Sequence, residues 1–234
     1  MHVEQQPDTL KVLKPWRDAG QPLGNHGWSH LNINDHTAAQ FEADIARNEP
    51  LLASLMPDTA AWHWFRFPFL NEGDTVEKRR EVRSWLSSHG YKTAQVTMSF
   101  GDYLWNEPYA RCAARHDDAS IAQLERSYLS AADQAIASDR SLSRTLFHRD
   151  IPYILLMHIG AFDAHMLPRL IDLYRSRGFT FVSLPQAASD PAYAEDPDIG
   201  LRSGGTLTQQ LMAQRHLALP HSAQPPAQLS SICR

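Results

Sequence analysis

Three histidines and one loop carry the residue types that could do chemistry. His26 and His30 are four residues apart, a spacing that places two imidazoles on one face of a helical turn and lets both bind one divalent ion. His158 follows the most apolar run of the chain, where an imidazole could act as a general acid or base. Asp102 and Trp105 share one loop and could supply a charge partner and a pocket wall. Because the chain has 12 histidines, surface or strand-end histidines remain the alternative interpretation.

A single arginine lies in an aromatic segment. Arg66 stands among the aromatic residues of 62–69, where burial without a carboxylate partner would be unfavourable. We expect its guanidinium to pair with an anion or to lie at a pocket rim, unless it reaches solvent from an edge strand. Pro68 directs the chain away from a sheet and leaves the amide of Phe69 able to face a ligand.

Helix-like and strand-like segments alternate along the chain, which predicts an α/β fold with a parallel sheet or barrel and helical crossovers. Loops at the carboxyl ends of such strands gather functional residues. We expect Asn34 or Asp35 to cap the second helix, Pro50 to kink or end it, and Asp117 with Asp118 to cap the long fourth helix. The expected helices are 9–19, 35–55, 75–89, 119–148, 163–177 and 206–215; the expected strands are 22–24, 62–69, 91–98, 151–158 and 179–184, with a loop at 99–108.

Taken in order, these segments resemble the polysaccharide deacetylase family, metal-dependent esterases that remove N- or O-acetyl groups from glycans such as chitin, peptidoglycan and xylan. The resemblance covers about 22–184. It implies that His26 and His30 bind the metal, that Arg66 orients the catalytic base, and that the backbone amide of Phe69 forms part of the oxyanion hole. The implied metal is zinc, with cobalt, manganese or iron also suited to such ligands.

The later segments match the remaining motifs of the family. The resemblance implies that Asp102 tunes the catalytic histidine and that Trp105 lines the acetyl pocket. Leu156 and His158 match the Leu-x-His motif, whose histidine protonates the leaving amine or alcohol. Asp102 and Trp105 are spaced more widely than the adjacent Asp-Trp pair often found in the family, and Gly27 replaces the Ser or Thr that follows the first metal-binding histidine.

The opening motif of the family, Thr-Phe-Asp-Asp, has no match before His26. In the family this motif supplies the catalytic base and a third metal ligand, so we expect the chain as given to be a poor catalyst. We expect an N-terminally incomplete chain whose upstream reading frame encodes this strand. The alternatives are a non-catalytic glycan-binding relative that keeps the pocket and an unrelated α/β scaffold in which the histidines are incidental.

The expected fold is therefore a distorted (β/α) barrel of the polysaccharide deacetylase type that lacks its first strand. We expect one deacetylase-like domain at 1–190 and a partly irregular tail at 191–234. The expected substrate is an acetylated glycan and the expected state a monomer. The polar start of the chain, Met1 to Gln6, has no signal sequence, so a periplasmic or extracellular location requires an upstream signal.

Composition narrows the class of protein. Of the 234 residues, 43% are hydrophobic and 21% are charged, which is typical of a soluble globule. The net charge of −4 disfavours a general electrostatic grip on nucleic acid or anionic lipid. The longest apolar runs fall far short of the roughly 20 residues that cross a bilayer. Cys112 and Cys233 could pair in an oxidising compartment and hold the tail, or remain inert thiols.

Overall fold

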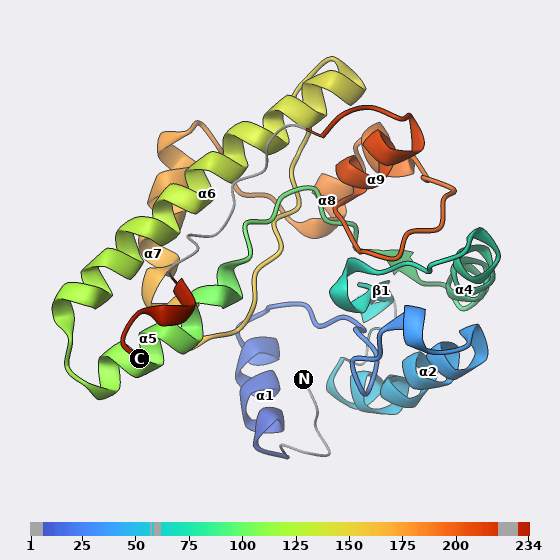
Figure 1. Ribbon diagram of the computed structural model, residues 1–234. Coiled ribbons are helices and arrows are strands. Elements are labelled where there is room, and N and C mark those ends of the chain that lie inside the picture. The colour runs from blue at the N-terminus through green and yellow to red at the C-terminus, as the bar shows by residue number, and fades with distance from the viewer. Residues whose placement is uncertain (1–6, 57, 59–61, 220–228) are drawn as a thin grey trace. The chain divides into compact units, whose positions relative to one another are not determined.

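The computed structural model describes residues 7–56, 58, 62–219 and 229–234 (Figure 1). The chain divides into two compact units, and each is described by itself. Unit 1 comprises Met1–Gln95 and Asp196–Gly205, and unit 2 comprises Val96–Glu195 and Thr206–Arg234. The sequence places a boundary at 190 and a tail after it, whereas the structure distributes that tail between the two units. Its stretch 220–228 lies outside the described residues, as does the N-terminal stretch 1–6.

Unit 1 alternates helices with short parallel strands. Strand β1 (Trp64–Phe65) pairs in parallel with β2 (Lys92–Thr93), and Asn25 forms a parallel bridge with Phe65. Helix α2 (Ala38–Leu55) joins the segment that contains Asn25 to β1, and α4 (Val76–Ser88) joins β1 to β2. This is the right order for parallel strands with helical crossovers. Helix α1 (Leu10–Asp18) precedes them, as the sequence predicts.

The helices of unit 1 begin at threonines. Thr37 caps α2 by accepting the N–H of Gln40, and Thr75 caps α4 in the same way. The prediction that Asn34 or Asp35 caps α2 is wrong, because both lie in a short 3-10 turn, Ile33–Asp35, that ends before the helix begins. Pro50 lies inside α2 and does not end it. A core of aromatic and branched side chains holds these helices on the strands; it includes Phe41, Ile45, Phe65, Phe67, Val82 and Leu86.

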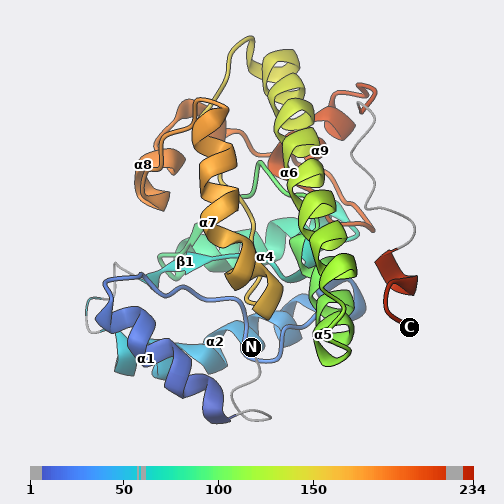
Figure 2. The same cartoon turned by 90° about the vertical axis from the view of Figure 1, so that its left-hand side faces the viewer.

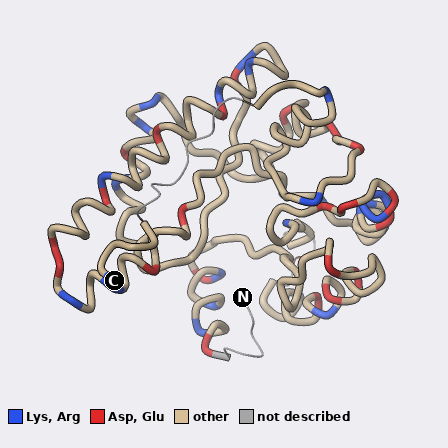
Figure 3. Tube along the Cα trace, viewed as in Figure 1, with Lys and Arg blue, Asp and Glu red and all other residues tan. Residues whose placement is uncertain are grey.

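A charged network fixes the returning segment Asp196–Gly205 to α4 within unit 1. Arg79 is almost completely buried and forms ion pairs with Glu72 and Asp196. Arg80, the next residue of the helix, is exposed and pairs with Asp198. Figure 3 shows residues of both signs gathered around α4. A buried guanidinium of this kind is retained because two carboxylates satisfy its charge.

Unit 2 is built around one long helix. Helix α6 (Asp118–Phe147) packs against α5 (Asn106–Ala114), α7 (Ala161–Ser176) and α9 (Leu207–Gln214), and Figure 2 shows α6 and α7 running side by side. The side chain of Asp117 caps α6 by accepting the N–H of Ser120, which confirms the capping role predicted for the Asp117–Asp118 pair. Helix α5 is a finding that the sequence missed, because its start falls in the expected loop 99–108.

The strands expected in unit 2 are largely absent from the described residues. The apolar run 151–158 makes one parallel bridge, between Met98 and Leu155, and is otherwise irregular. Pro152 has no N–H, and the amides of Thr97 and Met98 both donate to the carbonyl of Ile154, so the ladder does not continue. The expected strand 179–184 is also wrong.

In its place, Phe181 and Val182 are exposed and Ser183 caps the short helix α8 (Leu184–Ala188). The whole is a mostly helical α/β structure, and the closed barrel remains a prediction. No helix in the described part of the chain is long and apolar enough to cross a membrane.

Candidate functional site

In unit 1 the two predicted metal-binding histidines lie together. The ring centroids of His26 and His30 are 4.9 Å apart in an edge-to-face arrangement. The Nδ1 of His26 lies 2.6 Å from the carbonyl oxygen of Arg66. Because a carbonyl can only accept, this nitrogen carries the proton and Nε2 is the ring atom with a lone pair. Burial lowers the pKa of His26 to about 4, so its imidazole is neutral at physiological pH, the form that binds metals.

Asp44 on α2 holds the loop between the histidines. Its carboxylate accepts the backbone N–H groups of Trp28 and Ser29 at 2.9 to 3.1 Å. Gly27 has a positive φ of +75°, and a Cβ added there would lie 2.7 Å from Oδ2 of Asp44. Glycine therefore replaces the Ser or Thr of the family motif because the loop has neither the conformation nor the space for a side chain.

Arg66 and Phe69 also contact these imidazoles in unit 1. Arg66 donates from Nε to the carbonyl of Ala94 at 3.2 Å, and among the described residues no carboxylate pairs with its partly buried guanidinium. Burial lowers the pKa of Arg66 accordingly. Phe69 is 59% exposed with its ring centroid 4.6 Å from that of His30, and both Phe69 and Leu70 have positive φ. Two successive non-glycine residues in this region are a strained backbone of the kind that clusters at functional sites.

The donor set for a metal is incomplete in the described residues. The chemistry of His26 and His30 fits a divalent ion, since the carbonyl of Arg66 fixes the tautomer of His26 as outer partners of metal-binding imidazoles do. No group of three His, Cys, Asp or Glu that could hold a metal is found in the part of the chain that is described. Within the described ranges, His26 and His30 form a pair of imidazoles and not a group of three candidate ligands.

In unit 2 the structure brings Asp102 and His158 into contact. Asp102 is fully buried in the short turn Asp102–Trp105, and its Oδ1 lies 2.9 Å from Nδ1 of His158. Its Oδ2 also accepts the backbone N–H of His158 at 2.6 Å. The imidazole itself is 44% exposed. A buried carboxylate that orients a solvent-accessible imidazole is the arrangement that general acid–base catalysis requires.

The two other predicted pocket residues also lie in unit 2, and their pocket roles stay predictions. Trp105 is fully buried in the core of unit 2 and donates from its indole N–H to Ser127. Leu156 is partly buried and donates its N–H to the carbonyl of Met98.

The exposed aromatic ring next to His158 is that of Tyr103, 4.9 Å away between centroids and 53% exposed. Sequence reasoning missed Tyr103, although its position directly after Asp102 in a predicted loop was the available signal.

Comparison with known proteins shows what the first part of this chain is similar to. Residues 2–94 match the family model described as polysaccharide deacetylase. The matched region contains His26, His30, Arg66 and Phe69, and the match confirms the resemblance inferred from the sequence.

Two solved structures are similar to this chain. One is a mutant of a CE4 family pseudoenzyme with restored enzymatic activity, at 16% identity and a TM-score of 0.55 over 81% of this chain. This chain spans 56% of the length of that protein. The other is a family 4 carbohydrate esterase from Streptomyces lividans in complex with acetate, at 18% identity and a TM-score of 0.48, covering 76% of this chain and 73% of that one. No curated protein matches the chain. The first likeness shows a shared fold.

Proposed function

We propose that this chain acts on an acetylated polysaccharide as a deacetylase-type hydrolase, with His158 as the general acid. The observation that supports this most is the buried carboxylate of Asp102 in contact with Nδ1 of His158. When Nδ1 carries the shared proton, Nε2 is the atom that exchanges a proton with a leaving amine or alcohol, and Asp102 stabilises the imidazolium. Tyr103 then offers an exposed ring against which an acetyl group or a sugar face packs.

The metal belongs to the same proposal. His26 and His30 would hold a divalent ion, zinc in the first instance, and such an ion would supply Lewis-acid polarisation of the acetyl carbonyl. Arg66, which has no carboxylate partner among the described residues, would orient an acidic group that these residues do not provide. The backbone N–H of Phe69 would donate to the developing oxyanion.

The second candidate is a non-catalytic glycan-binding relative. One observation favours it: the described residues offer two metal-binding imidazoles and no third ligand. Such a chain would keep the apolar and aromatic groups that contact a sugar while lacking the carboxylates that hydrolysis needs.

Acetate release from acetylated chitooligosaccharides and from acetylated xylan, measured with zinc and with cobalt, separates these functions. The deacetylase proposal expects acetate release that His158→Ala and Asp102→Asn reduce by roughly 100-fold or more. His165→Ala is the matched control, because His165 is an exposed histidine of the same unit whose partner is Glu125. Saturable glycan binding without acetate release would instead support the binding module. A chain that neither binds these glycans nor releases acetate would support the unrelated scaffold.

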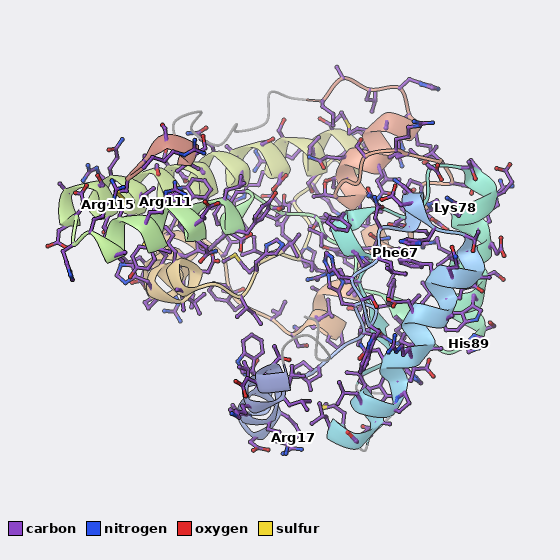
Figure 4. All side chains as sticks on the ribbon, turned by 60° about the horizontal axis from the view of Figure 1, so that its bottom comes forward. Arg17, Phe67, Lys78, His89, Arg111 and Arg115 are labelled. Carbon is purple, nitrogen blue, oxygen red and sulfur yellow. A yellow bond between two sulfur atoms is a disulfide. The ribbon has the colours of Figure 1, made fainter. Side chains whose placement is uncertain are left out.

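Metal binding is tested apart from activity. We expect titration calorimetry with zinc or cobalt to show a one-to-one complex. His26→Ala and His30→Ala should each lower the affinity for the metal at least tenfold. His89→Ala, at the carboxyl end of α4 (Figure 4), is the control and should leave the affinity unchanged. Equal affinity in all four proteins would overturn the metal site.

We also propose that the protein works as a monomer in an oxidising compartment, periplasmic or extracellular. Support for the compartment comes from the disulfide between Cys112 and Cys233, a bond that persists outside the reducing cytosol. Gel filtration with light scattering tests the monomer, and the redox state of these cysteines in protein isolated from its native compartment tests the location.

A further inference from the structure

The side-chain amide of Asn106 lies between the segment that carries Asp102 and the segment that carries His158. We propose that Asn106 and Asp163 act as positioning residues, a clamp that holds His158 in contact with Asp102. The inference rests on the proposed function only in taking His158 as the acid, because the clamp itself is a matter of geometry within unit 2.

The contacts of the clamp are direct. Nδ2 of Asn106 donates to Oδ2 of Asp163 at 2.6 Å, and Oδ1 of Asn106 accepts the backbone N–H of Phe162 at 2.9 Å. Nδ2 also lies 3.4 Å from the carbonyl oxygen of Tyr103, the residue after Asp102. One amide therefore joins the Asp102 turn to the first turn of α7, which begins three residues after His158.

The turn that follows His158 is closed against this amide. A Cβ added at Gly160 would overlap the side chain of Asn106, so the backbone between His158 and α7 lies directly against it. A change in the position of Asn106 would move this turn, and with it the N–H and the imidazole of His158 that Asp102 accepts. The close approach requires glycine at position 160.

Charge fixes which way the amide of Asn106 points. Asp163 is 4% exposed, and burial raises the pKa of its carboxyl, partly offset by the hydrogen bond from Asn106. The hydroxyl of Tyr128 donates to the other carboxylate oxygen of Asp163 at 3.0 Å. Asn106 must therefore present its NH₂ group to Asp163 and its oxygen to Phe162. An aspartate at position 106 would keep the acceptor but place two carboxylates in contact.

This polarity allows a test by reversal. Asn106→Asp breaks the contact with Asp163 by repulsion, whereas the double variant Asn106→Asp with Asp163→Asn restores it, since the amide now donates in the opposite direction. The readout is the Nδ1 proton and the ring ¹⁵N shifts of His158 in NMR spectra, a signature of the bond to Asp102. Glu107→Gln, one residue along α5 on its exposed side, is the matched control.

The clamp predicts a resolved Nδ1 proton of His158 in the wild type and the control, its loss in Asn106→Asp, and its return in the double variant. If acetate is released, kcat falls in Asn106→Asp by at least tenfold and recovers in the double variant, with KM little changed.

Unchanged His158 signals in Asn106→Asp, or no recovery in the double variant, would overturn the clamp. Should Asn106→Asp not fold, Asn106→Ala removes the side-chain amide and should likewise abolish the Nδ1 proton signal of His158. A chain without activity but with these NMR changes would refute the proposed function and leave the clamp standing.

Discussion

At the scale of single residues, the loop between the two predicted metal-binding histidines shows why glycine occupies position 27, where the family motif has Ser or Thr. Gly27→Ser would restore the motif residue, yet we expect it to destabilise unit 1. The serine side chain would collide with the carboxylate of Asp44. The left-handed backbone of this position would also be strained in a residue other than glycine. The expected loss is about 2 to 4 kcal/mol in the free energy of unfolding, measured by urea denaturation.

Gly20→Ala is the matched control for this substitution. Gly20 has a φ of +74°, nearly that of Gly27, but no atom lies within 4 Å of its added Cβ. Its substitution therefore reports the cost of the backbone alone, about 1 kcal/mol. Equal losses in Gly27→Ser and Gly20→Ala would show that Asp44 does not restrict the loop.

The buried imidazole of His26 gives a prediction for acid stability. Its folded pKa of about 4 lies below the unfolded value near 6.5, so the unfolded chain binds the proton first. The contribution of neutral His26 is present above pH 6.5 and is lost as the pH falls toward 4, at most about 3 kcal/mol. Urea midpoints at pH 7.5 and pH 4.5 should differ more in the wild type than in His26→Gln. Parallel pH profiles for the two proteins would contradict this prediction.

The sequence brought forward His26, His30 and Arg66 as candidate site residues from their spacing and surroundings, and the structure places them together in unit 1. Their contacts were harder to predict. The burial of Trp105 and the exposure of Tyr103 could not be predicted from the sequence. Either aromatic residue of the loop could face the core, and the short turn after Gly101 decides which one does. The roles of Asp44, Asn106 and Asp163 depend on hydrogen bonds between segments distant in sequence, which no local pattern encodes.

At the scale of elements, helices were predicted more accurately than strands. The expected strands 62–69 and 91–98 contain β1 and β2, which are much shorter. The bounds of α1, α4, α6 and α9 agree with the sequence to within a few residues, because capping residues and apolar spacing are local signals. A strand forms only where a neighbouring segment supplies partners for its backbone hydrogen bonds. The apolar runs 151–158 and 179–184 have the composition of strands. Among the described residues the first makes one bridge and the second makes none.

Helix α6 carries a buried carboxyl that makes stability depend on pH. Burial raises the pKa of Asp139 to about 7, and a hydrogen bond from the backbone of Ser99 offsets part of the shift. The folded pKa exceeds the unfolded one, so this contribution is fully present below pH 4 and is lost as the pH rises through 7. We expect Asp139→Asn to gain stability over the wild type between pH 5 and pH 8.5, by at most about 4 kcal/mol in urea denaturation.

Asp133 on the same helix is the control for this prediction. It is more exposed and pairs with Arg177, whose hydrogen bond lowers the pKa of the Asp133 carboxyl. Asp133→Asn should therefore lose a small amount of stability at both pH values and show no gain as the pH rises. If Asp139→Asn follows the pH profile of Asp133→Asn, the carboxyl of Asp139 is ionised in the folded protein and the prediction fails.

At the scale of the whole molecule, the chain passes between the two units three times, so neither unit is a continuous segment. Unit 1 recruits Asp196–Gly205 and unit 2 recruits everything after Thr206. A chain cut after Glu195 would lose the partner that Asp196 provides for Arg79 and the packing of α9 on α6. A boundary near 190, which composition suggests, therefore separates elements that the fold joins.

The disulfide between Cys112 and Cys233 closes a loop across 121 positions of sequence within unit 2. Arg111 and Arg115, which are labelled in Figure 4, donate to the backbone carbonyls of Ile232 and Arg234 and hold the C-terminal segment. Reduction should lower the free energy of unfolding by about 2 to 5 kcal/mol, because the unfolded chain regains the entropy of the open loop. Thermal denaturation with and without dithiothreitol measures this loss, and Cys112→Ala with Cys233→Ala should show the reduced value in both conditions. An equal melting temperature for oxidised and reduced wild type would mean that the arginine contacts alone hold the segment.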